Sequence, residues 1–428
     1  MTCEVVVLNR LGLSLAADSA VTFSSNDPSN SGSQTYSSGV NKIFQLAEKE
    51  AVGVMVFNAA SMQDVPWELI IKSFRTKFGA SSCPRLADYK KELADFIEQQ
   101  YELFPASYRE KQLEKLFARS ALIFVSELMK NSVLVDAAQL TSHSAEWAKF
   151  IQDIETLVSG TPLAHFFTAN DVSDAQIKFG PWLRQEIDTF VSTDSKIQHL
   201  STYFSDPKVS EIVIEGAFKF YQAAFGTFTG VVLAGYGKDD YFPAYHQTKY
   251  FGFVGEKLVW CDEATVSVGH DQASAIEAFA MKSMVETFLT GVAPSIWGGA
   301  LRGFKTHTEQ ACSEVLTKAG AALPAGDMAT IVEQAQNNFQ KEWNNTRMNE
   351  HYFPLVDVVA GLTVEEMGEL AETLVMLESL KEKVTLRTQS VGGPVDVAVI
   401  TKAEGLVWIK RKHYFSSELN HRYFSRQK

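Results

Sequence analysis

The sequence predicts an α+β fold in which two β-sheets are sandwiched between layers of helices. Strands occur in runs near the N-terminus, in the middle and at the end of the chain. A long stretch of helical periodicity, from about residue 85 to 225, interrupts this strand series. Runs of strands joined by short turns favour antiparallel pairing, whereas regular βαβ alternation would indicate a parallel sheet. The order of elements therefore predicts a sandwich that carries a large helical insertion.

Composition bounds the class of protein. The chain has 428 residues, of which 46% are hydrophobic, and a net charge of −12. An acidic chain of this kind lacks the basic footprint of a general nucleic-acid-binding protein. No apolar run of about 18 residues occurs, so we expect no membrane span. The N-terminus lacks the basic flank and cleavage site of a signal peptide. We expect a cytoplasmic protein.

The cysteines give no metal or disulfide pattern. They are scattered, with no CxxC pair and no zinc-ligand spacing, at Cys3, Cys83, Cys261 and Cys312. Reduced thiols are the simplest interpretation. No nucleotide-binding loop or metalloprotease motif occurs either, so the sequence predicts neither a metal nor a cofactor.

The first quarter of the chain predicts two strand pairs and a helix. The expected elements are strands at 3–8 and 13–17, a polar loop at 24–39, strands at 42–47 and 52–57, and a helix at 66–78. The first two strands are β-rich runs separated by the turn residues 9–12, which predicts a hairpin. Pro66 suits the first turn of the helix.

The remainder of the chain predicts the helical insertion, a second run of strands and a closing helix with two strands. The expected elements are helices over 85–225, strands at 229–236, 249–254 and 257–268, a helix at 271–289, a mixed segment at 291–350, a helix at 362–383, and strands at 396–402 and 405–411. Thr363 and Glu366 have the spacing of a capping box at the start of the closing helix.

The first hairpin places particular side chains together. In an antiparallel pair folded about Arg10, opposed positions have numbers that sum to about 20, so Thr2 should lie beside Asp18. Lys42 begins the next predicted strand after the polar loop and is a candidate third member. We therefore expect a hydroxyl, a carboxylate and an ammonium to converge near the start of the chain.

This trio has the chemistry of an activated nucleophile. A threonine hydroxyl needs a base within hydrogen-bond reach. A free α-amine, with a pKa of about 7.7–8.0, is such a base near neutral pH. The Lys42 cation would favour the deprotonated forms of the amine and hydroxyl, and Asp18 would hold Lys42 charged and oriented. The scheme requires Thr2 to carry a free amine, and threonine is small enough for an aminopeptidase to remove Met1.

The same residues carry a family resemblance. The segments TCEVVV, LAADS and VNKIFQL, with the tail VGGPVDV, resemble proteasome β subunits and still more the peptidase subunit of the bacterial two-component ATP-dependent protease. In those proteins a threonine starts the first strand, an aspartate ends the second and a lysine opens the third, matching Thr2, Asp18 and Lys42. The resemblance covers residues 1–78, 229–290 and 360–412, and it implies the four-layer αββα sandwich of N-terminal-nucleophile hydrolases.

The chain departs from the family pattern in its supporting residues. The family places a Gly-Ser-Gly turn before a helix, and this turn corresponds to residues 269–271. The serine that assists the threonine in the family is therefore replaced by His270 or is absent. The aspartate and serine expected before the tail glycines fall on Thr388 and Val391, with Ser390 one position away. The glycine whose N–H donates to the oxyanion matches Ala59, which keeps the main-chain donor.

Other residues have weaker claims to chemistry. Cys3 would become a nucleophile only if processing removed one more residue, which would shift the register against Asp18. The acidic pairs at 239–240 and 262–263 are typical of solvated turns rather than of a metal site. The segment Trp297-Gly298-Gly299 is either a pocket wall or a packed aromatic inside an insertion.

We therefore expect a hydrolase core formed by 1–80, 226–290 and 360–428, with a helical insertion at 81–225 and a second insertion at 291–359. The expected function is a threonine protease or amidase that cleaves peptide or amide bonds through Thr2. The resemblance also implies a peptide or protein substrate, self-assembly into a homo-oligomer and a separate ATP-driven unfoldase. The alternatives are a small-molecule amidase and a non-catalytic proteasome-like scaffold or binding subunit.

Overall fold

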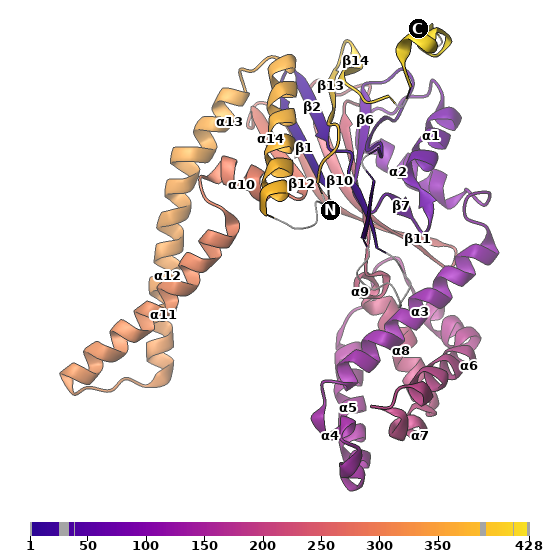
Figure 1. Cartoon of the computed structure of the whole chain (residues 1–428), viewed down its shortest axis with the longest axis vertical. Helices are drawn as coiled ribbons and strands as arrows, with labels where there is room; N and C mark the ends of the chain where they lie inside the picture. The colour runs from indigo at the N-terminus through magenta and orange to yellow at the C-terminus, as the bar shows by residue number, and fades with distance from the viewer. Residues whose placement is uncertain (1, 25–33, 38, 386–390, 414, 426–428) are drawn as a thin grey trace.

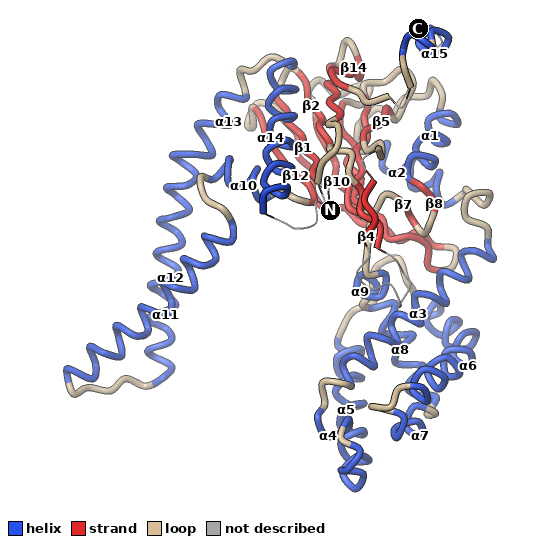
Figure 2. The backbone as a smooth tube through the Cα atoms, in the orientation of Figure 1, coloured by secondary structure: helices blue, strands red, loops and turns tan. Residues whose placement is uncertain are grey.

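A computed structural model describes residues 2–24, 34–37, 39–385, 391–413 and 415–425. The fold is mixed α+β with two five-stranded sheets, both antiparallel, and helices on their outer faces (Figures 1 and 2). The α+β class and the antiparallel pairing agree with the sequence-based expectation. None of the described helices is long and apolar enough to cross a bilayer.

The first sheet contains the N-terminal hairpin at its centre. Its strand order is β12-β1-β2-β13-β14. These strands are β1 (Cys3–Asn9), β2 (Gly12–Ala17), β12 (Ser274–Ala280), β13 (Asp396–Thr401) and β14 (Gly405–Lys410). The turn between β1 and β2 has two residues, because Asn9 opposes Gly12. The numbers of opposed residues therefore sum to 21, so the register is shifted by one residue from the expected one.

The second sheet has the order β11-β10-β9-β6-β5. Its strands are β5 (Ile43–Gln45), β6 (Val52–Asn58), β9 (Thr229–Gly235), β10 (Ala244–Val254) and β11 (Lys257–Ser267). Two further pairs of short strands are β3 (Val21–Ser24) with β4 (Gln34–Ser37), and β7 (Ser61–Met62) with β8 (Val65–Pro66). The first of these pairs corrects part of the loop expected at 24–39, whose residues 25–33 and 38 lie outside the described residues.

The strand period of two divides β1 between two cores. Val6 and Leu8 belong to a buried cluster shared with the second sheet, which contributes Met55 and Val232. Val5 and its outward-facing neighbours pack instead against α14 (Val364–Thr385). Both faces of β1 are therefore buried, and a side chain on its sheet-facing side lies between the two sheets.

The outer face of the second sheet is covered by α1 (Trp67–Phe78) and α2 (Asp88–Glu98). Trp67 and Ile70 of α1 share one apolar cluster with Tyr89 and Leu93 of α2. We expected α2 to open the helical insertion, but its apolar face packs on the sheet beside α1.

The helical insertion follows α2 and lies below the sheets (Figure 1), with an apolar core that includes Phe251 and Val254 of β10 and Val259 of β11. Its helices are α3 (Ala106–Leu128), α4 (Ser132–Val135), α5 (Leu140–Gly160), α6 (Ala169–Thr193), α7 (Ser201–Phe204), α8 (Pro207–Lys219) and α9 (Tyr221–Phe225). Residues 81–225 are all described and contain helices and no strand. α3 runs from the sheet into the insertion and packs against β10.

The second insertion forms a helical arm, α11 (Pro294–Ala319) and α12 (Ala325–Arg347), which projects away from the sheets in Figure 1. No side chain of α11 is buried within its described residues. Trp297 stacks on Trp343 with ring centroids 4.9 Å apart. Of the two interpretations of this tryptophan, the structure supports the packed aromatic. The chain then passes through α13 (Phe353–Val359) to α14 and ends with α15 (His421–Ser425).

The prediction of a helix at 271–289 is wrong for most of its length. Residues Ser274–Ala280 form β12, which pairs along the whole of β1, and the helix begins only with α10 (Ser283–Thr290). Alanine and glutamate favour a helix here by propensity. Pairing with β1 overrides that preference, because Ala275 and Phe279 then face the other sheet while Ile276 faces α14.

Candidate active site

Thr2 lies at the open end of the first hairpin, next to the start of α10. Its carbonyl accepts a hydrogen bond of 2.9 Å from the N–H of Met281, which follows β12. The side chain alternation of β1 directs Thr2 and Glu4 to the same side as Val6, between the two sheets. Only 3% of Thr2 and none of Glu4 is exposed.

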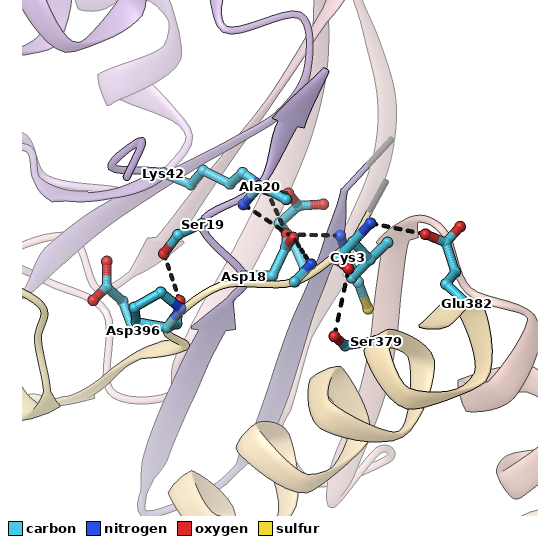
Figure 3. Close-up of polar contacts among 12 residues, drawn as sticks. Cys3, Asp18, Ser19, Ala20, Lys42, Ser379, Glu382 and Asp396 are labelled. Atoms are coloured by element: carbon cyan, nitrogen blue, oxygen red, sulfur yellow. Dashed lines mark hydrogen bonds and ion pairs between the residues drawn. The ribbon is translucent and has the colours of Figure 1, made fainter. Parts of the chain in front are cut away.

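Asp18 lies at the centre of the polar contacts (Figure 3). Its Oδ1 accepts from the N–H of Cys3 at 3.0 Å, and its Oδ2 accepts from the N–H groups of Ala20 at 3.2 Å and Gly392 at 2.9 Å. The Lys42 ammonium donates to Oδ1 as well. Because of the register shift, Asp18 is tied to the backbone of Cys3 rather than placed directly opposite Thr2.

The tail glycines give Asp18 one of these donors. Gly392 and Gly393 have φ values of 154° and 77°, which glycine adopts readily. This conformation brings the Gly392 N–H to Asp18 and its carbonyl to the N–H of Ser19, at 3.1 Å. The glycine pair therefore connects the C-terminal strands to the candidate site.

Lys42 comes from the second sheet and places its ammonium between two carboxylates. Its backbone is anchored by a 2.9 Å bond from the N–H of Val56, and the residue is 3% exposed. Its Nζ forms an ion pair with Asp18 and lies 3.3 Å from Oε1 of Glu4. Asp18 and Lys42 thus meet as an ion pair with Glu4 beside them, and Thr2 lines the same cavity as Lys42.

Glu4 is the residue that the sequence reasoning missed. Burial raises its pKa from 4.5 to about 7, an effect that Asp18 increases and that Lys42 and the Thr2 hydroxyl reduce. A charged residue inside the apolar run CEVVVL, two positions from the candidate nucleophile, was the available signal. The period of two already places Thr2 and Glu4 on one face of the strand.

By strict geometry the Thr2 hydroxyl and both carboxylate oxygens of Glu4 lack a hydrogen bond among the described residues, although the hydroxyl lies close enough to the Glu4 carboxyl to lower its pKa and the Lys42 ammonium lies 3.3 Å from Oε1. Thr2 also lines a cavity of about 360 Å³. The walls of this cavity include Val40, Lys42, Phe57, Ala59 and Trp67. The candidate nucleophile therefore belongs to the wall of a space large enough for a side chain, and its hydroxyl lies near the Glu4 carboxyl.

Strained backbone surrounds this cavity. Among the described residues, the non-glycine positions with positive φ are Asn58, Gln63, Asp64 and Ala280. Asn58 and Asp64 line the Thr2 cavity, and Ala280 precedes the Met281 N–H that binds Thr2. Such conformations cost about 1–3 kcal/mol each and concentrate at functional sites. Ala59 follows Asn58 directly, so its main chain is positioned by a strained residue at the cavity wall.

A second cavity of about 340 Å³ adjoins the first, since both are lined by Ala59, Ser61 and Asp64. Its far wall includes Lys115 and Arg119 of α3. The helical insertion therefore contributes to the same concave region as Thr2.

Other sequence candidates lie elsewhere or have ordinary partners. His270 lies at the opposite end of the first hairpin, where its carbonyl accepts from Arg10 and its ring contacts Phe242. It is therefore not placed to assist Thr2. Cys3 faces α14, and burial raises its pKa well above the ordinary thiol value, which opposes a reactive thiolate. Thr388 and Ser390 lie outside the described residues.

The acidic pairs serve structure. Asp240 pairs with Arg85 and accepts from two backbone N–H groups, while Asp262 and Glu263 pair with Lys90 and Lys249. No group of three or more His, Cys, Asp or Glu suited to a metal ion occurs within the part of the chain that is described.

No protein-family model matches the chain, and no curated protein sequence matches it.

Proposed function

We propose that the chain is a proteasome-like N-terminal-nucleophile hydrolase that cleaves peptide or amide bonds with Thr2, in a mature form that begins at Thr2. The observation that carries the proposal is the cavity lined by both Thr2 and Lys42, with the Lys42 ammonium held by Asp18. The helices outside each sheet and the apolar core between the sheets favour the αββα sandwich of this class.

The reaction uses the residues in distinct roles. The neutral α-amine of Thr2 takes the Oγ1 proton as Oγ1 attacks the substrate carbonyl carbon. The main-chain N–H of Ala59 stabilises the oxyanion. The C–N bond then breaks, and the α-ammonium returns the proton to the leaving nitrogen. Water hydrolyses the resulting ester with the same amine as base, which restores the Thr2 hydroxyl.

Lys42 and Asp18 set the electrostatics of these steps. The Lys42 cation favours the neutral amine and the developing alkoxide. Asp18 is fixed by three backbone N–H groups, so it holds Lys42 in one position without moving during the reaction. The cavity beside Thr2 would take one substrate side chain, and the adjoining cavity would take a neighbouring part of a peptide or protein.

The test uses protein whose N-terminus is Thr2 and measures its hydrolysis of a set of peptide and amide substrates. Thr2→Ala should abolish turnover without unfolding the chain, while Thr2→Ser should retain part of it. Ser14→Ala is the matched control, since Ser14 is another buried, unsatisfied hydroxyl, on the neighbouring strand. Turnover that survives in Thr2→Ala contradicts the proposal.

A non-catalytic scaffold subunit is the alternative, and the helical arm favours it. The arm projects away from the sheets and buries no described side chain of α11, which leaves the surface of this helix open to another chain. Self-assembly, a cytoplasmic location and a separate ATP-driven unfoldase are compatible with either function. A folded, Thr2-first protein that assembles but hydrolyses nothing in the substrate set favours the scaffold.

A further inference from the structure

The candidate site contains two carboxyl groups for one ammonium. Asp18 and Glu4 are carboxylates, and Lys42 is the cation that lies between them. All three are almost completely buried, with exposed fractions of 1%, 0% and 3%. Isolated buried charge is costly, so buried carboxylates are normally paired.

The imbalance lies at Glu4 rather than at Asp18. Asp18 accepts three backbone N–H groups in addition to the Lys42 ammonium. Both oxygens of Glu4, in contrast, are buried without a hydrogen-bond partner among the described residues. Within the described part of the chain its one ion-pair partner is Lys42, at 3.3 Å, and Lys42 is already held by Asp18. Glu4 therefore shares its cation with Asp18, and a second positively charged donor would complete its pairing.

We propose that Glu4 is the buried counter-ion of the Thr2 α-ammonium, a positioning residue that fixes the amine beside the Thr2 hydroxyl. The inference rests on the proposed function, because it needs a chain that begins at Thr2. Thr2 is two residues before Glu4 on the same face of β1, and its hydroxyl lies near enough to the carboxyl to affect its titration. With Met1 retained, the Thr2 nitrogen is a neutral amide and cannot supply the missing charge.

The pairing has a consequence for pH. The charged groups that act on Glu4 are Asp18 from the end of β2 and Lys42 from the start of β5, while β12 places the apolar Phe279 opposite it. A new cation beside Glu4 lowers the pKa of its carboxyl, and Glu4 in turn raises the pKa of the amine. Loss of the carboxylate should therefore move the acid limb of the pH–rate profile to lower pH.

A thermodynamic cycle tests the pairing without measuring turnover. Four proteins are compared at pH 8 by urea unfolding: chains that retain Met1 and chains that begin at Thr2, each with and without Glu4→Gln. Glu4→Gln should stabilise the Met1-retaining chain and destabilise the Thr2-first chain. The two effects on the unfolding constant should differ at least about tenfold, the equivalent of one pKa unit. The same effect in both chains overturns the inference.

A control and a second variant make the result specific. Glu277→Gln removes a half-buried carboxylate on β12 whose pKa is also raised by burial, and it should change both chains equally. If Glu4→Gln does not fold, Glu4→Asp replaces it in the cycle, keeping the charge but withdrawing it by one methylene. The effects of Glu4→Asp on the two chains should then differ with the same sign but by a smaller amount. Equal effects on both chains overturn the inference.

The pH profile of turnover separates this inference from the proposed function. In active Thr2-first protein, Glu4→Gln should lower the midpoint of the acid limb by about one unit or more and reduce the maximal rate about tenfold. An unchanged midpoint in an active variant contradicts the role of Glu4 alone. Absence of turnover in the unsubstituted protein contradicts the proposed function and leaves the stability cycle to decide on Glu4.

Discussion

The stability of the Met1-retaining chain should depend on pH through Glu4. Burial raises the folded-state pKa of this carboxyl from 4.5 to about 7, so the folded chain binds the proton more tightly than the unfolded chain. The stabilising contribution is fully present below about pH 4.5 and is lost as the pH rises through about 7. A shift of this size corresponds to roughly 3 kcal/mol at 1.36 kcal/mol per pKa unit.

The assay is urea unfolding of the Met1-retaining chain and its Glu4→Gln variant, followed by circular dichroism, between pH 4.5 and 8.5. At the acid end a protonated Glu4 resembles glutamine, so the two free energies of unfolding should be close. At the alkaline end the variant should be the more stable by about 3 kcal/mol. A difference between the two proteins that stays constant across this range refutes the assignment of Glu4 as a buried, poorly paired carboxyl.

Three further perturbations test the surroundings of the site. Asp18→Ala removes the acceptor of the N–H groups of Cys3, Ala20 and Gly392 and should destabilise the chain by about 3 kcal/mol or more in thermal or urea unfolding; a loss below 1 kcal/mol contradicts this role of the carboxylate. Gly392→Ala forces alanine into φ 154° and should cost about 1 kcal/mol or more, measured in the same way, with unchanged stability arguing against the strained turn. Cys3 should resist iodoacetamide at pH 8 in the folded protein and react after unfolding, because burial raises the pKa of its thiol; rapid native labelling contradicts this.

Much of the core was predictable because its signals are local. The N-terminal hairpin and the tail strands are each two short β-rich runs separated by a turn that the sequence indicates. β13 and β14 begin at the expected residues. The capping box at the start of α14 also forms, since Thr363 and Glu366 exchange hydrogen bonds. These elements need only neighbouring residues to specify them.

The remaining differences arise from interactions between distant segments. β12 is a strand because β1 offers a pairing edge between two buried faces, which the alanine-rich sequence alone does not indicate. The hairpin register depends on whether the turn has an odd or even number of residues, so arithmetic about Arg10 was one residue out. Glu4 escaped notice because it opens an apolar strand, and its significance depends on Lys42 arriving from the other sheet.

The most direct measurement of the central claim is covalent labelling of the Thr2-first protein with an electrophile selective for N-terminal threonine. Intact mass and N-terminal sequencing first establish that Met1 is absent, and mass spectrometry of the digest then locates the adduct. The predicted result is a single adduct on Thr2, lost in Thr2→Ala and reduced about 10²–10³-fold in rate in Lys42→Ala. A folded protein that begins at Thr2 and takes up no label contradicts the assignment of Thr2 as the nucleophile.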